Sequence, residues 1–125
     1  MLREADVIEC EGEPVQLLDA WEAAEAAWVV DAVSSGATPG TVHRLDATQA
    51  ELPRELFRSS THAFGLAESI ELARALDRLP ARLVVFGIEG ASFGAGEGLS
   101  TAVEEAAGRV EAAVREEVEK CTRRP

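Results

Sequence analysis

Hydrophobic and polar residues alternate along the chain in blocks that predict strands and helices in turn. ADVIECEG (residues 5–12) predicts a short strand. Pro14 then suits the first turn of a helix. Apolar side chains recur at helical spacing through VQLLDAWEAAEAAW, at Leu17, Leu18, Trp21, Ala24 and Trp28. Both tryptophans are therefore expected to lie in the core.

Three further segments predict strands. The uninterrupted apolar runs AAWVVDAV (residues 26–33) and ARLVVFGIEG (residues 81–90) are typical of strands buried on both faces. TVHRLD (residues 41–46) alternates apolar and polar positions, with His43 as a half-exposed strand residue. SSGATPG (residues 34–40) is too short for a crossover helix, so we expect AAWVVDAV and TVHRLD to form an antiparallel pair.

Two more helices complete the pattern. One is predicted over residues 64–79, with one apolar face made by Leu66, Ile70, Ala73 and Leu76. The other is predicted over residues 101–120, with i,i+4 ion pairs Glu105/Arg109, Glu111/Arg115 and Glu116/Lys120. Strands that alternate with helices indicate an α/β fold. We expect one domain, residues 1–125, built as a three-layer sandwich around a mixed, mostly parallel sheet.

Composition narrows the classes of partner. The chain has 125 residues, enough for a single core, and a net charge of −11. Such an acidic balance argues against nucleic acid and against anionic membrane surfaces. The apolar runs are too short to span a bilayer. Cys10 and Cys121 have no zinc-site spacing, and two distant cysteines suggest a reducing cytoplasm.

Three residues could share a site at the carboxyl ends of the strands, where open α/β sheets bind ligands. Asp31 follows AAWVV, Glu89 follows LVVFGI, and His62 precedes a helix. Aspartate, glutamate and imidazole suit a divalent metal such as zinc or nickel. An acidic residue that ends a strand is more often a solvated terminus, and spacing alone leaves both interpretations open.

The loop after the last strand contains a G-x-S-x-G match, GASFG (residues 90–94). A nucleophile elbow requires its acid and its histidine later in the chain, and no histidine follows His62. The loop also lacks the Gly-Lys-Ser/Thr ending of a P-loop. We therefore predict neither a serine hydrolase nor a nucleotide site, and the role of the loop over residues 90–98 stays open.

Three segments resemble successive landmarks of one family, the hydrogenase maturation proteases: VVDAVSSGATPGTVHRLDA, STHAFGLAESIELARAL and RLVVFGIEGASFGAGEGLSTAVEEA. The resemblance implies an endopeptidase that trims the C-terminus of a nickel-iron hydrogenase large-subunit precursor. Members recognise nickel in that precursor through a glutamate, an aspartate and a histidine. The matching positions here are Asp31 and His62. No organic cofactor is implied, and the residues that cut the peptide bond stay unknown.

The chain departs from the family pattern at its start. MLREADVIECEG resembles the family's second strand, so the first strand, its helix and the loop carrying the glutamate are expected to be lacking. We do not assign that glutamate's role to Glu89 or Glu9. Three explanations are open: the start lies upstream, another chain supplies the edge, or the chain is a binding homologue that docks on the precursor without cleaving it. Self-association through the incomplete sheet and an unrelated small-molecule-binding α/β protein are further alternatives.

Overall fold

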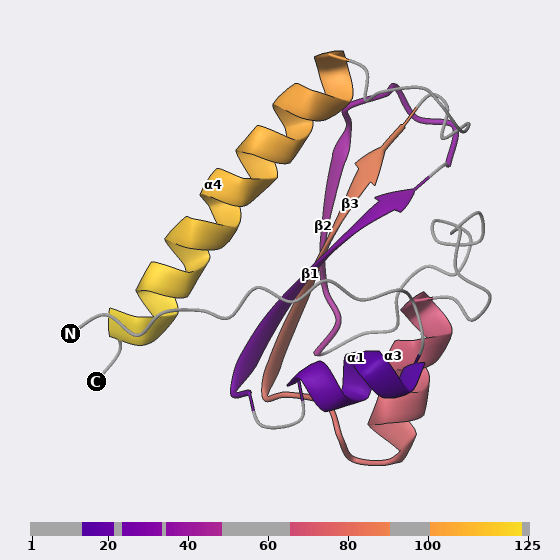
Figure 1. Ribbon diagram of the computed structural model, residues 1–125, viewed down its shortest axis with the longest axis vertical. Coiled ribbons are helices and arrows are strands. Elements are labelled where there is room, and N and C mark those ends of the chain that lie inside the picture. Colours follow the sequence, from indigo (N-terminus) through magenta and orange to yellow (C-terminus); the bar gives the residue numbers. More distant parts are fainter. Residues whose placement is uncertain (1–13, 22–23, 34, 49–65, 91–100, 124–125) are drawn as a thin grey trace.

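The computed structural model describes residues 14–21, 24–33, 35–48, 66–90 and 101–123. The elements follow in the order α1 (Pro14–Trp21), β1 (Ala26–Val33), β2 (Val42–Asp46), α3 (Leu66–Ala75), β3 (Arg82–Glu89) and α4 (Thr101–Arg123) (Figure 1). The strand predicted over residues 5–12 lies outside the described residues, as do His62 and residues 91–98.

The described strands form a mixed sheet in the order β1-β3-β2. β1 is parallel to β3, from Ala26 opposite Arg82 to Val33 opposite Glu89. β2 is antiparallel to β3. A mixed sheet is thus confirmed, but the expected pairing of β1 with β2 is wrong because β3 lies between them. β3 is buried from Leu83 to Glu89, and a strand so apolar gains most from the central position, with neighbours on both edges.

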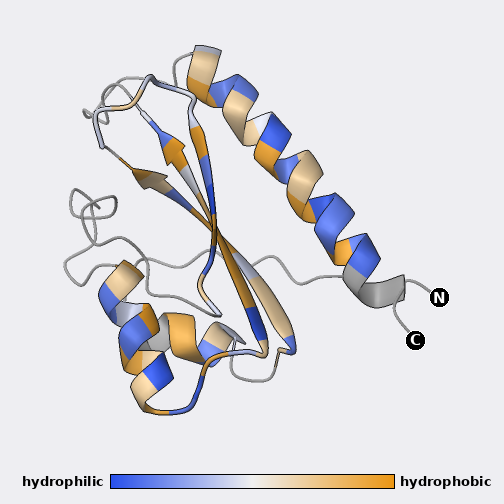
Figure 2. Ribbon diagram, turned by 180° about the vertical axis from the view of Figure 1, so that it is seen from behind, coloured by the Kyte–Doolittle hydropathy of each residue, from blue (hydrophilic) through white to orange (hydrophobic). Residues whose placement is uncertain are grey.

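Helices cover both faces of the sheet, which confirms the three-layer α/β sandwich. α1 and α3 lie on one side and α4 on the other (Figure 1). The first interface is built from apolar residues of α1, α3 and alternate strand positions, among them Leu18, Trp21, Ile70, Leu83 and Val85. The second is built from the other strand positions and α4, among them Val84, Phe86, Ile88, Val103 and Val110. Polar and apolar residues alternate along α4 (Figure 2), as expected of a helix with one solvated face.

Two predictions about the segment that forms β1 are wrong. The helix at the start ends at Trp21, which is 3% exposed, and Trp28 belongs to β1, where it packs on the α4 side of the sheet. Burial on both faces holds for β3 and is wrong for β1, since Val30 is 52% exposed. Composition alone could not separate the two runs, because β1 has one hydrogen-bonded neighbour among the described strands and β3 has two.

α3 is shorter than its pattern predicts. Ala73 is buried as expected, but the helix ends at Ala75 and Leu76 is 53% exposed. Asp77 adopts a left-handed conformation, with φ 56°. The amide of Arg78 then donates to the carbonyl of Ala73 at 2.8 Å, the bond that closes a Schellman motif. Aspartate tolerates this conformation better than most residues, so the sequence stops the helix one turn before its apolar pattern ends.

Glu117 attaches α4 to all three described strands. Its carboxylate accepts hydrogen bonds from Arg44 Nε of β2 at 2.9 Å, from Arg44 Nη2 at 2.7 Å and from Trp28 Nε1 of β1 at 3.1 Å. Arg82 Nη2 of β3 lies 3.7 Å from Glu117 Oε1. The bonds from Arg44 are the largest influence on the Glu117 pKa and hold it below its ordinary value, against the effect of burial. The Arg44 guanidinium also lies 6.0 Å from the centre of the Phe86 ring, in cation–π range.

We therefore expect Glu117→Ala to destabilise the fold by about 1.5–3 kcal/mol, the range for hydrogen bonds to charged groups. Glu116→Ala is the matched control, since Glu116 is exposed and forms the predicted i,i+4 pair with Lys120 at 3.2 Å. Its cost should stay within about 0.5 kcal/mol. Urea denaturation of the two variants measures the difference, and equal losses would show that Glu117 does not anchor α4.

Candidate functional site

One face of the sheet changes from apolar to polar near the carboxyl ends of β1 and β3. On the α1/α3 side the strands contribute apolar residues over most of their length: Ala27, Val29, Val33, Leu45, Leu83 and Val85. Gly87 of β3 lies opposite Asp31 of β1 on one side and opposite His43 of β2 on the other. Side chains of paired residues share a face, so Asp31 and His43 flank a position that carries no side chain. Glu89 follows on the same face, two residues beyond Gly87.

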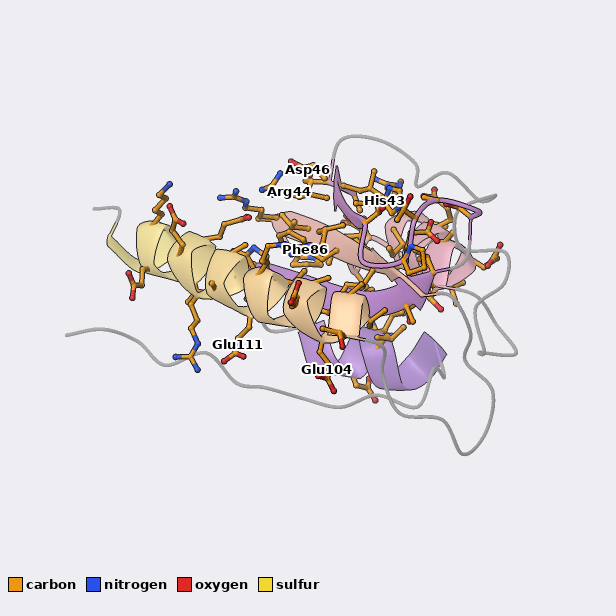
Figure 3. All side chains as sticks on the ribbon, turned by 90° about the horizontal axis from the view of Figure 1, so that it is seen from above. His43, Arg44, Asp46, Phe86, Glu104 and Glu111 are labelled. Carbon is orange, nitrogen blue, oxygen red and sulfur yellow. The ribbon has the colours of Figure 1, made fainter. Side chains whose placement is uncertain are left out.

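Glu89 is the buried polar centre of this region, with 1% of its surface exposed. Its carboxylate accepts hydrogen bonds from the backbone amide of Ser35, at 3.2 Å and 3.1 Å from the two oxygens, and from the Ser35 hydroxyl. His43 Nε2 lies 3.1 Å from Glu89 Oε1. The imidazole is partly solvated, with 27% of its side chain exposed. Figure 3 shows His43 and its neighbour Arg44 on β2.

These contacts keep Glu89 ionised. Burial is the largest single influence and would by itself raise the pKa of Glu89 above its ordinary value of 4.5. The hydrogen bonds from the Ser35 hydroxyl and amide and from His43 together outweigh it, so the net pKa is lowered. Since an ionised carboxylate can only accept, the His43 nitrogen that faces it carries the proton. The neutral imidazole then has its lone pair on Nδ1.

The backbone around Glu89 holds the loop between β1 and β2 over the end of β3. Gly40 N donates to the Glu89 carbonyl at 2.9 Å, and Glu89 N donates to the Thr41 carbonyl at 2.9 Å. Gly90 N donates to the Val33 carbonyl at 3.2 Å. Arg109 of α4 donates from Nη2 to the Gly40 carbonyl at 3.1 Å. The loop is thereby attached to β1, β3 and α4, and this fixes Ser35 against the Glu89 carboxylate.

Asp31 lies near the carboxyl end of β1, within the strand and not after it. Its Oδ1 accepts a hydrogen bond from the amide of Ala32 at 2.9 Å. Asp31 and Glu89 both lie near the carboxyl ends of their strands, as the sequence suggested, and the register places them on one face of the sheet. His62 lies outside the described residues, so its place beside Asp31 stays a prediction. The part of the chain that the structure describes contains no group of three or more potential ligands placed to hold a metal ion.

Sequence reasoning missed the partners of Glu89. His43 was predicted to be only a half-exposed strand residue, and Ser35 was treated as part of a turn. The alternation in TVHRLD does put His43 on the same face as Leu45, which is the available signal. The insertion of β3 between β1 and β2 brings Glu89 within reach of His43, and no local pattern reveals that order.

Comparison with known families shows to which family the chain belongs. The model of the hydrogenase maturation protease family (HycI) matches residues 2–117, nearly the whole chain. The chain belongs to the hydrogenase maturation protease family. The resemblance seen in the three sequence segments is thus confirmed, and so is the α/β fold that it implied.

Solved structures agree with this assignment. An endopeptidase from Escherichia coli is similar with a TM-score of 0.67 and 28% identity, over 90% of this chain and 72% of that one. The hydrogenase maturating endopeptidase HybD from E. coli has a TM-score of 0.55 and 24% identity, over 82% of this chain and 66% of its own. The hydrogenase 2 maturation peptidase from Thaumarchaeota archaeon SCGC_AB-539-E09 has a TM-score of 0.51 and 23% identity, over 75% of this chain and 64% of its own. The last two likenesses show the fold alone.

This chain spans only part of the length of the matched proteases. It covers about two thirds of HybD and of the archaeal peptidase. None of the curated protein sequences compared with the chain matches it significantly. Among the described residues, no helix is both long enough and apolar enough to cross a membrane.

Proposed function

We propose that this chain is an endopeptidase that removes the C-terminal extension of a nickel-iron hydrogenase large-subunit precursor after nickel insertion. The observation that carries the proposal is the family match over residues 2–117. The fold of two hydrogenase maturation peptidases, which this chain shares, agrees with that family. The nickel belongs to the substrate, and the protease needs no organic cofactor.

Asp31 and His62 are the proposed contacts to the nickel in the precursor. A carboxylate and an imidazole are suitable ligands for nickel. Asp31 lies near the carboxyl end of β1, the edge at which α/β sheets bind ligands, and on the face that carries Glu89. His62 enters through the resemblance of STHAFGLAESIELARAL to the family. Nickel thus marks a precursor that is ready to be cut.

The test compares a nickel-loaded precursor with the same precursor free of nickel. We expect mass spectrometry to show that only the loaded form is shortened by its C-terminal extension. Asp31→Asn and His62→Ala should each slow this cleavage by about 100-fold or more, since loss of a mere outer-shell partner of a metal site already costs about 10- to 100-fold. Asp19→Asn is the matched control, because Asp19 lies on α1 with 66% of its side chain exposed.

Two outcomes would contradict the proposal in different ways. A wild-type chain that binds the loaded precursor without shortening it would be a docking homologue and not an endopeptidase. Cleavage that continues at the wild-type rate in Asp31→Asn or His62→Ala would remove that residue from nickel recognition and leave the endopeptidase activity in place.

A further inference from the structure

We propose that His43 is the general base of peptide-bond hydrolysis in this protease and that Glu89, held by Ser35, is the residue that positions it. The inference rests on the proposed endopeptidase function and supplies the catalytic group that nickel recognition leaves open. It is drawn from the arrangement of His43, Glu89 and Ser35 at the carboxyl end of β3.

The first argument is the orientation of the imidazole. Glu89 is 1% exposed and its oxygens face Ser35 and His43, so this carboxylate is fixed in place. Because Glu89 accepts from His43 Nε2, the ring is held in the tautomer whose Nδ1 has the lone pair. A carboxylate that orients an imidazole in this way also stabilises the imidazolium formed when the ring takes up a proton.

The second argument is access. Glu89 is closed off from solvent, whereas 27% of the His43 side chain is exposed. The imidazole can therefore meet water and a peptide, while the carboxylate behind it stays dry. The neighbouring position on the same face is Gly87, which places no side chain between His43 and Asp31.

The third argument is the relation to the proposed nickel contact. Asp31 and His43 lie on the two strands that flank β3, at the same level along it. Two strand spacings separate them, or about 10 Å. A precursor held through its nickel at Asp31 thus presents its nearby backbone to His43, so one row of residues can both recognise and cut.

The reaction balances with water as the only co-reactant. His43 Nδ1 takes a proton from a water molecule while the water oxygen bonds to the scissile carbonyl carbon and the carbonyl π electrons move to its oxygen. The tetrahedral intermediate then collapses, the C–N bond breaks, and the proton held by His43 passes to the leaving nitrogen. The products are a new carboxyl terminus and a free amine, and His43 returns to its neutral form.

The test measures single-turnover cleavage of the nickel-loaded precursor at saturating protease, with precursor affinity measured separately. In His43→Gln the amide nitrogen can still donate to Glu89, but no basic nitrogen is left. We expect its cleavage rate to fall by about 100-fold or more, with affinity unchanged, as for loss of a general base. Glu89→Gln should also lower the rate while leaving affinity unchanged. Arg44→Gln is the control, one residue along β2 and on the opposite face, and should cleave at the wild-type rate.

Chemical rescue separates catalysis from a structural role. Added imidazole should restore part of the activity of His43→Ala, because the exposed side of the ring leaves a path for the small base. Wild-type cleavage by His43→Gln would overturn the proposal, as would a loss in His43→Ala that imidazole does not restore. If the wild-type chain itself fails to cleave, the endopeptidase function fails together with this inference. A loss of cleavage that occurs in the variants and not in the wild type bears only on the proposed general base.

Discussion

Gly40→Ala is expected to destabilise the fold by about 2–4 kcal/mol. This range combines the cost of a left-handed backbone conformation with the cost of overpacking. Gly40 is buried at the end of the β1–β2 loop, with φ +90°. A Cβ at this position would lie 2.8 Å from the carbonyl oxygen of Ala102, in the first turn of α4. Backbone atoms of a helix cannot move aside as a flexible side chain can, so the loop or the helix must shift.

Gly36→Ala is a close control for this effect. Gly36 has nearly the same backbone conformation, with φ +92°, but an added Cβ would meet nothing within 4 Å. Its substitution therefore carries the conformational cost without the collision, about 1–2 kcal/mol. Thermal or urea denaturation of both variants isolates the contact between the loop and α4. Equal losses at the two glycines would mean that the approach of Gly40 to Ala102 contributes nothing to stability.

Glu89→Gln is expected to cost about 2–3 kcal/mol at neutral pH, because an ionised acceptor is replaced by a neutral amide in a buried site. The hydroxyl and amide of Ser35 and the ring of His43 all face this carboxylate. An amide has one acceptor oxygen, and its NH₂ group would face donors. The comparison variant is Glu111→Gln on α4, whose side chain is 65% exposed and pairs with Arg115. Its loss should stay within about 0.5 kcal/mol.

The same variant tests the pH dependence of folding. The pKa of Glu89 is lowered in the fold below its ordinary value of 4.5. A depressed carboxyl pKa contributes stability above the unfolded value and loses it as the pH falls through the folded value. The difference in unfolding free energy between wild type and Glu89→Gln should thus be constant near neutral pH and shrink below about pH 4.5. A difference in unfolding free energy that grows on acidification would show that the pKa of Glu89 is raised in the fold and not lowered.

Glu117 and Glu89 lie on opposite faces of the sheet, one with a structural role and one with a proposed functional role. On the α4 side, Glu117 accepts hydrogen bonds from Arg44 and Trp28 and so connects α4 to the strands. On the other side, at the carboxyl end of β3, Glu89 contacts Ser35 of the β1–β2 loop and His43. His43 and Arg44 are adjacent on β2, so their side chains point to opposite faces of the sheet and contact Glu89 and Glu117 respectively. In Figure 3, Glu104 and Glu111 lie on the side of α4 away from His43 and Arg44, so these two carboxylates belong to the solvated face of the helix.

The sequence by itself determined the elements and the family. Its apolar periodicity located β1, β2, β3, α3 and α4, since burial of one helix stripe or one strand face depends on local spacing. Three landmark segments indicated the hydrogenase maturation proteases, and the family match agrees. It also predicted that Asp31 and Glu89 lie at one edge, because parallel strands end at the same side of a sheet.

Only the tertiary structure decided the order of the strands, and with it the partners of Glu89. Two apolar runs looked alike in sequence, yet among the described strands β3 has two hydrogen-bonded neighbours and β1 has one, because strand order is a property of the whole sheet. That order puts His43 opposite Gly87 and the β1–β2 loop over the buried carboxylate. His43 and Glu89 are 46 positions apart, and contacts at such a separation are fixed by packing, which no local spacing encodes.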